Sequence, residues 1–206
     1  MSELALLGEG SLLALSGIGR AAAAAAAQAL VDAGASSLMT FGMAGGLDPN
    51  LKPGSVVIPG EVLVAEGGRY TTSRAWREQV AAAISPLCAV SEGNLLTSTH
   101  AIETPAEKAA AFRDTGAAAV DMESAAVAEI AAKHHLPFIA VRVIVDTAAD
   151  VLPRAVVAAS RLGKVRFGRL IGGLILAPRE IVGLIRLAQR YRIAMRSLHA
   201  IGAHLA

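Results

Sequence analysis

Two kinds of apolar segment alternate along the chain, and together they predict a layered fold. Short runs rich in Val, Ile and Leu, bounded by Gly, Pro or Asp, are typical of buried strands. Longer alanine-rich segments with polar residues at helical spacing indicate helices. Because the two kinds alternate, we expect an α/β fold: a three-layer αβα arrangement with a central mixed sheet.

The expected elements follow from these runs and from the turn residues between them. A hairpin is expected over Leu4–Ser16, where two short strands surround Gly-Glu-Gly. Further strands are expected over residues 37–42, 55–65, 94–99, 118–122 and 136–146. Helices are expected over residues 21–33, 73–84, 104–116 and 123–135. The helix at 104–116 has the clearest limits, with Thr104 as N-cap, Pro105 at its first position and Gly116 at its end.

Composition narrows the class of protein. The 206 residues suit one domain with a sizeable core, or one domain plus an appendage. With 54% hydrophobic but only 3% aromatic residues, the core is expected to be aliphatic. A single cysteine, Cys88, excludes an internal disulfide and a cysteine-based zinc cluster. Met1–Leu15 lacks the basic start of a signal peptide. The apolar run Leu170–Ala177 is far shorter than the roughly 20 residues that span a bilayer, so we expect a cytoplasmic protein.

Charge divides the chain into two parts. Residues 1–150 carry nine basic and 16 acidic side chains, whereas residues 151–206 carry ten basic ones and a single acid, Glu180. We therefore expect a catalytic domain over 1–150 and a basic, apolar, helical extension over 151–206. A basic tail on an acidic body suggests an anionic surface as its partner: lipid headgroups, nucleic acid or the body itself.

Candidate chemistry gathers where predicted strands end. Gly42–Gly46, Asp121–Glu123 and Asp146 each follow or finish an apolar strand. In open α/β sheets, ligands bind beyond the carboxyl ends of the strands. These three segments are therefore predicted to share one site.

Asp146 is the candidate general acid. One interpretation is an N-cap for a following helix. In the other, desolvation at the end of an apolar strand favours the protonated carboxyl, which can then donate a proton to a leaving group such as a purine nitrogen.

Glu123 and its neighbours are candidates for binding a sugar. Glu123 could simply complement a helix dipole, but its two carboxylate oxygens also suit the vicinal hydroxyls of a ribose. Met122 is either a core residue or a flexible contact for the sugar or base. Asp121 points away from Met122 by strand alternation, which favours a structural role.

Two glycine motifs allow close backbone approach to a ligand. One is the segment 42–46, and the other is the "GIGR" that precedes the alanine-rich helix. In the second motif, Gly17, Gly19 and Arg20 are the candidates for holding a phosphate or a water molecule at a helix N-terminus.

Taken together, these pieces resemble the purine and uridine phosphorylase superfamily, which includes the methylthioadenosine/S-adenosylhomocysteine nucleosidases. The resemblance rests on "SGIGRAAAAAAAQAL", "GMAGGLDPNLKPGSVVIP", "AVDMESAAVA" and "PFIAVRVIVDTA", which occur in the family's order. It implies a phosphorylase/hydrolase-like fold and cleavage of an N-glycosidic bond. It implies no metal or organic cofactor, with inorganic phosphate as a co-substrate if the reaction is phosphorolysis. A homo-oligomer is also implied.

The resemblance assigns a role to each candidate residue. Met122 and Glu123 match the ribose contacts, and Asp146 matches the aspartate that protonates the purine N7. The loop beneath the sugar corresponds to Gly42, Met43, Ala44 and Gly45. The segment His100–Ile102 falls where base contacts are found, and Ile102 is the candidate there.

The basic tail resembles that of the hopanoid-associated phosphorylases, which are implicated in removing adenine from adenosylhopane. At helical spacing, one broad face collects the apolar residues Ile181, Leu184, Leu187, Ala188, Tyr191, Met195 and Leu198. Arginines 179, 186 and 190 lie opposite. Such a helix packs on its own domain, or lies peripherally on the inner membrane face with its arginines on anionic headgroups.

Two departures from the family keep the reaction open. Thr40 or Phe41 stands where phosphorylases carry a phosphate-binding arginine, which leaves Arg20 as the nearby cation. The family's first strand has no match, and neither Glu3 nor Glu9 fits its catalytic glutamate. The alternatives are a methylthioadenosine/S-adenosylhomocysteine nucleosidase-like hydrolase and a catalytically impaired nucleoside-binding protein. Nucleic acid is not expected as a partner, because the tail lacks a recognition motif.

Overall fold

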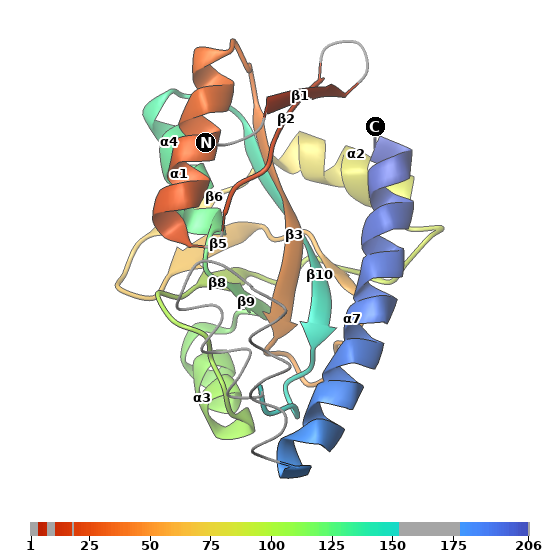
Figure 1. The fold of residues 1–206 in the computed structure, drawn as a ribbon. Coiled ribbons are helices and arrows are strands. Elements are labelled where there is room, and N and C mark those ends of the chain that lie inside the picture. Colours follow the sequence, from red (N-terminus) through yellow and green to blue (C-terminus); the bar gives the residue numbers. More distant parts are fainter. Residues whose placement is uncertain (1–3, 8–10, 18, 153–177, 206) are drawn as a thin grey trace.

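The structure is a computed structural model. It describes the backbone of residues 4–7, 11–17, 19–152 and 178–205 (Figure 1). Side chains are described for 11–17, 19–152 and 186–205. Residues 153–177, which belong to the predicted basic extension over 151–206, lie outside the described residues.

A mixed sheet forms the centre of the described part of the chain. Its order is β6-β5-β8-β9-β3-β10-β4-β7, with both parallel and antiparallel neighbours. The strands are β3 (Leu38–Gly46), β4 (Val56–Val57), β5 (Glu61–Val64), β6 (Arg69–Thr71), β7 (Val90–Ser91), β8 (Leu95–Thr97), β9 (Ala119–Asp121) and β10 (Phe138–Asp146). The predicted N-terminal hairpin is present as a separate pair, β1 (Leu4–Leu7) and β2 (Ser11–Ala14).

Helices cover both faces of this sheet, which confirms the predicted three layers. They are α1 (Arg20–Asp32), α2 (Arg74–Ile84), α3 (Pro105–Thr115), α4 (Ser124–Lys133) and α7 (Pro178–Leu205). Figure 1 shows α1 and α4 side by side on one side of β3 and β10, with α2 and α7 on the other. The helix α3 lies at the end of the molecule towards which β3 and β10 run (Figure 1).

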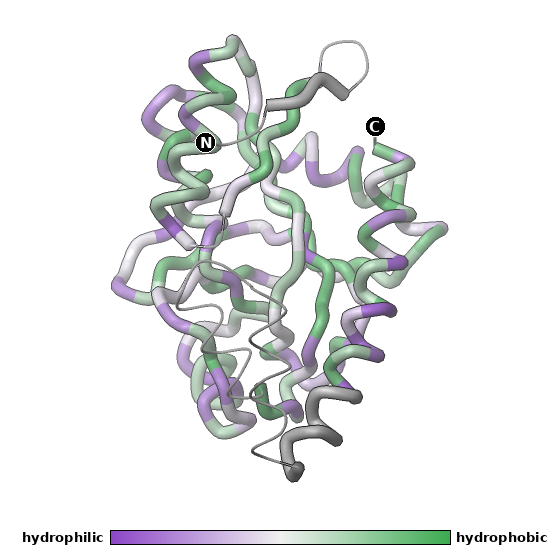
Figure 2. The backbone as a smooth tube through the Cα atoms, in the orientation of Figure 1, coloured by the Kyte–Doolittle hydropathy of each residue, from purple (hydrophilic) through white to green (hydrophobic). Residues whose placement is uncertain are grey.

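Alternation along β10 divides the core into two. Phe138, Ala140 and Ile144 pack among the alanines of α1 and α4. The intervening residues 139, 141 and 143 pack against α2 and α7. Figure 2 shows the two long strands as predominantly apolar, with polar positions on the outer helices. The strand is therefore buried on both faces, and a polar side chain on it needs a partner inside the protein.

Two of the sequence predictions about strands were wrong in detail. The run 55–65 is not one strand, because it breaks at Pro59–Gly60 into β4 and β5, which lie far apart in the sheet order. Proline cannot donate a ladder hydrogen bond, which explains the break. In addition, the glycines at 42–46 form the second half of β3 rather than a loop after it.

The N-terminus of α3 has the predicted caps in full. Thr104 Oγ1 accepts a hydrogen bond from the Glu107 backbone, and the Glu107 carboxylate accepts bonds from the backbone N–H groups of Thr104 and Glu103. These bonds to the charged form lower the pKa of Glu107. The helix ends at Gly116, which adopts a φ of 65° that favours glycine. Both ends of α3 are thus fixed, and so is the position of Lys108, its buried residue.

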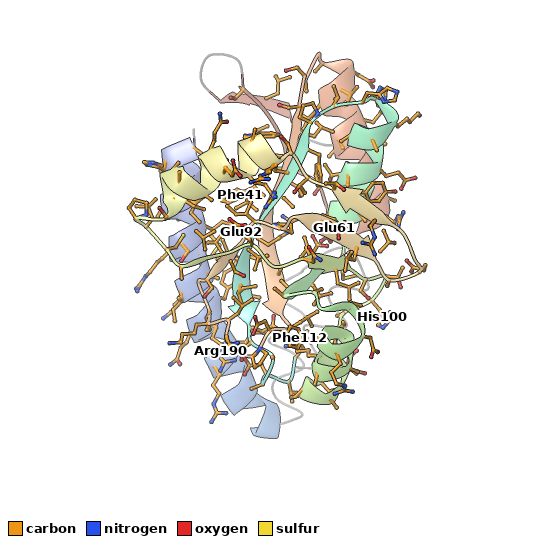
Figure 3. All side chains as sticks on the ribbon, turned by 180° about the vertical axis from the view of Figure 1, so that it is seen from behind. Phe41, Glu61, Glu92, His100, Phe112 and Arg190 are labelled. Carbon is orange, nitrogen blue, oxygen red and sulfur yellow. The ribbon has the colours of Figure 1, made fainter. Side chains whose placement is uncertain are left out.

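The C-terminal helix packs with a face that only partly overlaps the predicted one, and Leu198 of the predicted face does pack against the core. Ala194 and Ile201 are buried against β10 and α2, whereas Ala188 and Tyr191 of the predicted apolar face are exposed. Arg190 is half-buried in an ion pair with Asp150, and Figure 3 shows it on α7. Ile181 and Leu184 lie outside the described side chains. Within the described ranges, no helix has both the length and the apolar character needed to cross a membrane.

We expect Gly93→Ala to destabilise the fold. A Cβ at position 93 would lie 2.5 Å from the Cβ of Ala118, so the loop before β8 would have to shift. Overpacking of this kind costs about 1–3 kcal/mol. Gly60→Ala is the matched control, because the nearest atom to its new Cβ is 3.8 Å away. Urea denaturation checks this, and equal midpoints for the two variants would contradict it.

Candidate functional site

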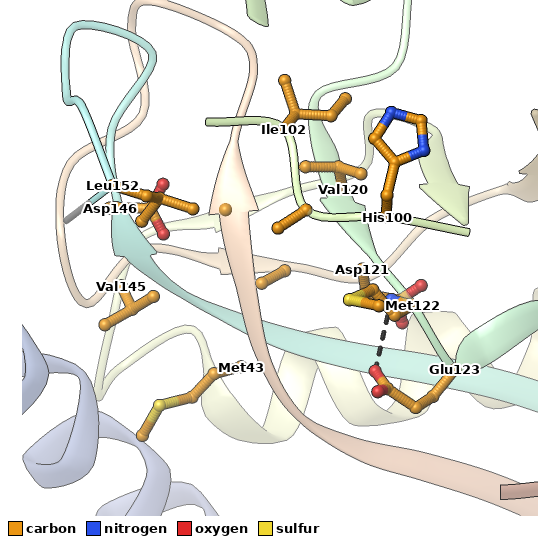
Figure 4. Close-up of a pocket in the computed structure, with 13 residues that line it drawn as sticks. Met43, His100, Ile102, Val120, Asp121, Met122, Glu123, Val145, Asp146 and Leu152 are labelled. Carbon is orange, nitrogen blue, oxygen red and sulfur yellow. Dashed lines mark hydrogen bonds between the residues drawn. The ribbon is translucent and has the colours of Figure 1, made fainter. Parts of the chain in front are cut away.

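A pocket of about 210 Å³ lies where β3, β9 and β10 come together (Figure 4). It is lined by Met43, Ala44, Gly45, His100, Ala101, Ile102, Val120, Asp121, Met122, Glu123, Val145, Asp146 and Leu152. The predicted candidates from three distant parts of the sequence, namely 43–45, 122–123 and 146, are therefore brought together. Figure 4 shows Asp146 and Glu123 approaching the pocket from different sides of β3.

The three candidate segments lie together for a different structural reason from the one predicted. The prediction relied on strand ends sharing one edge of the sheet, but β9 runs antiparallel to β3, with Val120 opposite Gly45. Because β9 has only three residues and pairs with the last two of β3, its following residues turn back beside β3. The site therefore lies alongside the end of β3, where the short strand leaves it uncovered.

A β-bulge near the end of β10 directs Asp146. Ile144 pairs with Ala44 and Asp146 pairs with Gly45, which leaves Val145 as the extra residue. A Cβ at Gly45 would lie 3.2 Å from Asp146 Oδ2 and 3.4 Å from Oδ1. Glycine at position 45 thus gives the carboxylate the space it occupies.

A cation contacts this carboxylate directly. The ammonium of Lys108, on α3, donates to Asp146 Oδ2 and, at 2.8 Å, to the backbone carbonyl of Thr147. Both side chains are almost completely buried. The sequence predicted only apolar surroundings for Asp146, and that prediction was incomplete. Between them the two groups hold a transferable proton without burying a net charge.

Glu123 lies at the start of α4 as predicted, but its carboxylate contacts two backbone groups. Oε1 accepts from the N–H of Gly19 at 2.9 Å, and Oε2 accepts from the N–H of Met122 at 3.2 Å (dashed in Figure 4). A carboxylate has about four acceptor sites, so each oxygen keeps one for another donor. The side chain is therefore oriented by the backbone and can still accept from a diol.

Asp121 has the structural role that strand alternation predicted. Its Oδ2 accepts from Arg142 Nε at 2.8 Å, and its Oδ1 accepts from Thr97 Oγ1 at 2.8 Å. The Arg142 guanidinium also donates to Thr40 and Ser124. This buried network joins β3, β8, β9, β10 and the first turn of α4 beneath the pocket.

The predicted phosphate or water site is only partly beside the pocket. Gly19 reaches it through Glu123, but Arg20 pairs with Glu129 on the surface, where both side chains are about half exposed. Gly17 is exposed. Gly42 does not line the pocket, and a Cβ there would lie 3.1 Å from an Arg142 nitrogen.

A second, larger hollow of about 440 Å³ lies between the N-terminal hairpin, the face of β3, and helices α2 and α7. Its lining residues include Leu12, Met39, Phe41, Trp76 and Leu205 and carry no titratable side chain. Acid–base chemistry therefore belongs to the smaller pocket. The described residues contain no group of three or more His, Cys, Asp or Glu side chains arranged to hold a metal ion.

Several lining residues were not predicted. Val120, Val145 and Leu152 add apolar walls. His100, in the loop before α3, also lines the pocket and belongs to the predicted segment His100–Ile102 (Figures 3 and 4). Lys108 was missed altogether. A lone lysine within an alanine-rich helix is ordinarily a solvated residue, and nothing in its local pattern signals that it is buried.

The chain was compared with family models, with curated protein sequences and with solved structures. The family model described as "Phosphorylase superfamily" matches residues 5–175. A search of curated protein sequences found no match.

Solved structures share the fold. A futalosine hydrolase from Helicobacter pylori is 15% identical with a TM-score of 0.68, covering 98% of this chain and 88% of that one. A 5′-methylthioadenosine/S-adenosylhomocysteine nucleosidase from Neisseria meningitidis, in complex with methylthio-immucillin-A, is 21% identical (TM-score 0.63; 96% and 88%). Its counterpart from Colwellia psychrerythraea, in complex with adenine, is 23% identical (TM-score 0.61; 72% and 74%).

We predict that Arg142→Met destabilises the protein by about 3–5 kcal/mol, because it leaves the buried Asp121 carboxylate without its counter-ion. Asp121→Asn added to this variant should recover part of the loss, since an amide carries no charge yet can still accept from Thr97 and Ser124. Chemical denaturation of both single variants and the double variant measures the coupling. Additive losses would contradict the ion pair as the cause.

Proposed function

Because the chain belongs to the phosphorylase superfamily, we propose that it cleaves the N-glycosidic bond of an adenosine-type nucleoside and releases adenine. The observation that carries this proposal is that Asp146 and Glu123 line the same pocket. Cleavage of this bond needs a proton for the departing base and a grip on the sugar, and these two carboxyl groups suit those tasks.

The proposed reaction is heterolysis of the bond between C1′ and the base. The bonding electrons move into the purine, and the Asp146 carboxyl group delivers a proton to its N7. Glu123 accepts hydrogen bonds from the ribose hydroxyls, and Met122 packs against the sugar. Water or phosphate then forms the new bond to C1′. When water is the nucleophile, its surplus proton replaces the one given to the base.

The choice of nucleophile rests on the pairing of three positions within the part of the chain whose side chains are described. Thr40 or Phe41 stands where the resemblance to phosphorylases would place an arginine, and the Thr40 hydroxyl accepts a bond from Arg142 at 2.7 Å. Arg142 is itself paired with Asp121. Arg20 is paired with Glu129. These pairings favour water over phosphate, which supports a hydrolase similar to the methylthioadenosine/S-adenosylhomocysteine nucleosidases.

For the substrate, we propose adenosylhopane, with methylthioadenosine or S-adenosylhomocysteine as the alternative. The resemblance of the tail to hopanoid-associated phosphorylases supports the first. The pocket volume of about 210 Å³ is below the roughly 300–1,000 Å³ of sites for drug-sized ligands. A large apolar substituent on C5′ would therefore have to lie outside the pocket. The fold shared with solved nucleosidases supports the alternative.

The last helix provides a surface for a lipid-linked substrate. Arg186, Arg192 and Arg196 are exposed on α7, together with Tyr191 and Ile193. A basic surface with an aromatic and an aliphatic side chain suits the headgroup region of an anionic bilayer. We propose that α7 makes peripheral contact with such a membrane.

We expect Asp146→Asn to lower the rate of adenine release by at least about 100-fold, because an amide cannot donate the acid proton. Adenine is measured by chromatography after incubation with adenosylhopane or methylthioadenosine, with and without phosphate. Dependence on phosphate separates phosphorolysis from hydrolysis.

The control for this variant is Asp114→Asn, an exposed carboxylate on α3. Because the amide introduced by Asp146→Asn would leave the Lys108 ammonium without a counter-ion, thermal denaturation must show that the variant is folded. A folded Asp146→Asn protein with wild-type turnover would refute the assignment. Adenosylhopane or methylthioadenosine binding without adenine release by the wild type would instead favour a nucleoside-binding protein.

We expect the chain to co-sediment with vesicles of phosphatidylcholine and phosphatidylglycerol but not with phosphatidylcholine alone. Changing Arg186, Arg192 and Arg196 together to glutamine should reduce binding by roughly 100-fold, at about 1 kcal/mol per basic residue. A triple change of Arg69, Arg74 and Arg113, which are exposed elsewhere, is the matched control. Equal binding by the two triple variants would exclude α7 as the contact.

A further inference from the structure

We propose that Lys108 is the positioning residue for the acid, holding with Asp146 the single proton that reaches the leaving base. This inference rests on the proposed function. It adds a residue from α3 that neither the sequence motifs nor the likeness to solved structures assigns. The observation behind it is a fully buried lysine whose ammonium donates to the carboxylate of Asp146.

Lys108 is held where it can act on only a few atoms. Its ammonium donates to Asp146 Oδ2 and to the Thr147 carbonyl. The capping box of Thr104 and Glu107 fixes the start of α3, one turn before Lys108. A buried lysine costs several kcal/mol unless it is paired, so a merely solvated residue would not be placed here.

The remaining oxygen of Asp146 is the one available to a ligand. Among the described residues, no group donates a hydrogen bond to Oδ1, and Asp146 lines the pocket that Lys108 does not reach. Lys108 thus contacts the Asp146 carboxyl group from the side away from the pocket. A proton can pass from Lys108 Nζ to Oδ2 while Oδ1 gives one to the base.

The proton balance of this step is complete. Before cleavage the pair is either ammonium and carboxylate or amine and carboxylic acid, and both forms carry one transferable proton and no net charge. When the C1′–base bond breaks, that proton ends on the base, leaving neutral Lys108 and ionised Asp146. A proton from the attacking water or phosphate, relayed through solvent, restores the pair after the base departs.

Other titratable groups lie in the same pocket or on neighbouring elements and must be separated from the pair in any pH experiment. They are Asp121 on β9, Glu123 at the start of α4, His100 and Glu103 before α3, Glu107 on α3, Asp150 after β10, and Arg190 on α7. The pocket-lining residues 43–45 of β3 contribute none. All of them persist in a Lys108 variant, so a difference between wild type and variant reports on Lys108.

The test compares Lys108→Met and Lys108→Arg with the wild type. At neutral pH, Lys108→Met should lower kcat by about 100-fold or more with KM changed only a few-fold. Its rate should rise as pH is lowered, because a carboxyl group that has lost its lysine must take the transferred proton from solvent. Lys108→Arg keeps a cation but cannot release a proton, so its rate should stay low at every pH.

Arg113→Met, which removes an exposed charge from the same helix, is the control for general effects on α3. Circular dichroism and thermal denaturation establish that each variant is folded. A Lys108→Arg protein with wild-type kcat would show that only a counter-ion is required and would overturn the proposal. An unchanged pH profile in Lys108→Met would do the same.

Adenine binding, measured by calorimetry, keeps this test separate from catalysis. The wild type should bind adenine equally at pH 5 and pH 7.5, whereas Lys108→Met should bind it at least tenfold more weakly at the higher pH. If the wild type binds and releases adenine and the variant behaves identically, only the role of Lys108 falls. If the wild type neither binds nor releases adenine, the proposed function falls and takes this inference with it.

Discussion

The site depends on one buried ion pair, that between Arg142 and Asp121. Arg142 lies on the face of β10 that otherwise packs among alanines, and Asp121 ends the short strand β9. Neither charge is tolerable there alone. The pair and its hydroxyl partners Thr40, Thr97 and Ser124 therefore fix β9 against β3 and set the start of α4. This network therefore also determines the positions of Met122 and Glu123, the next two residues.

Much of the architecture could be predicted from the sequence, because capping residues and apolar runs determine where helices and strands begin and end. Helix α3 appeared with its capping threonine and terminal glycine, and β10 appeared as an apolar run ending in Asp146. The predicted candidates at 43–45, 122–123 and 146 also line one pocket. What could not be read locally was strand direction. Nothing within residues 118–122 reveals that β9 runs antiparallel to β3, since direction is settled by which strands lie beside it.

Lys108 and part of the buried face of α7 were missed for a related reason. A lysine among alanines has the same local pattern whether it meets solvent or a buried carboxylate, and only the distant Asp146 decides. On α7, several apolar residues surround the helix, so the periodicity admits more than one buried face. Contact with β10 and α2 selects Ala194 and Ile201. Arg190 then turns inward to Asp150 rather than outward.

The pairing of the acidic side chains also determines the electrostatic potential in the pocket that Asp146 and Glu123 line. Asp121 is neutralised by Arg142 and Asp146 by Lys108, whereas the described partners of Glu123 are uncharged backbone amides. Of the three carboxylates, Glu123 is thus the one that gives the pocket a residual negative potential. Such a potential attracts the positive charge that grows on a sugar ring as its bond to a base stretches, and it repels an approaching anion. The same arrangement would make cationic mimics of that stretched sugar tighter ligands than their neutral counterparts.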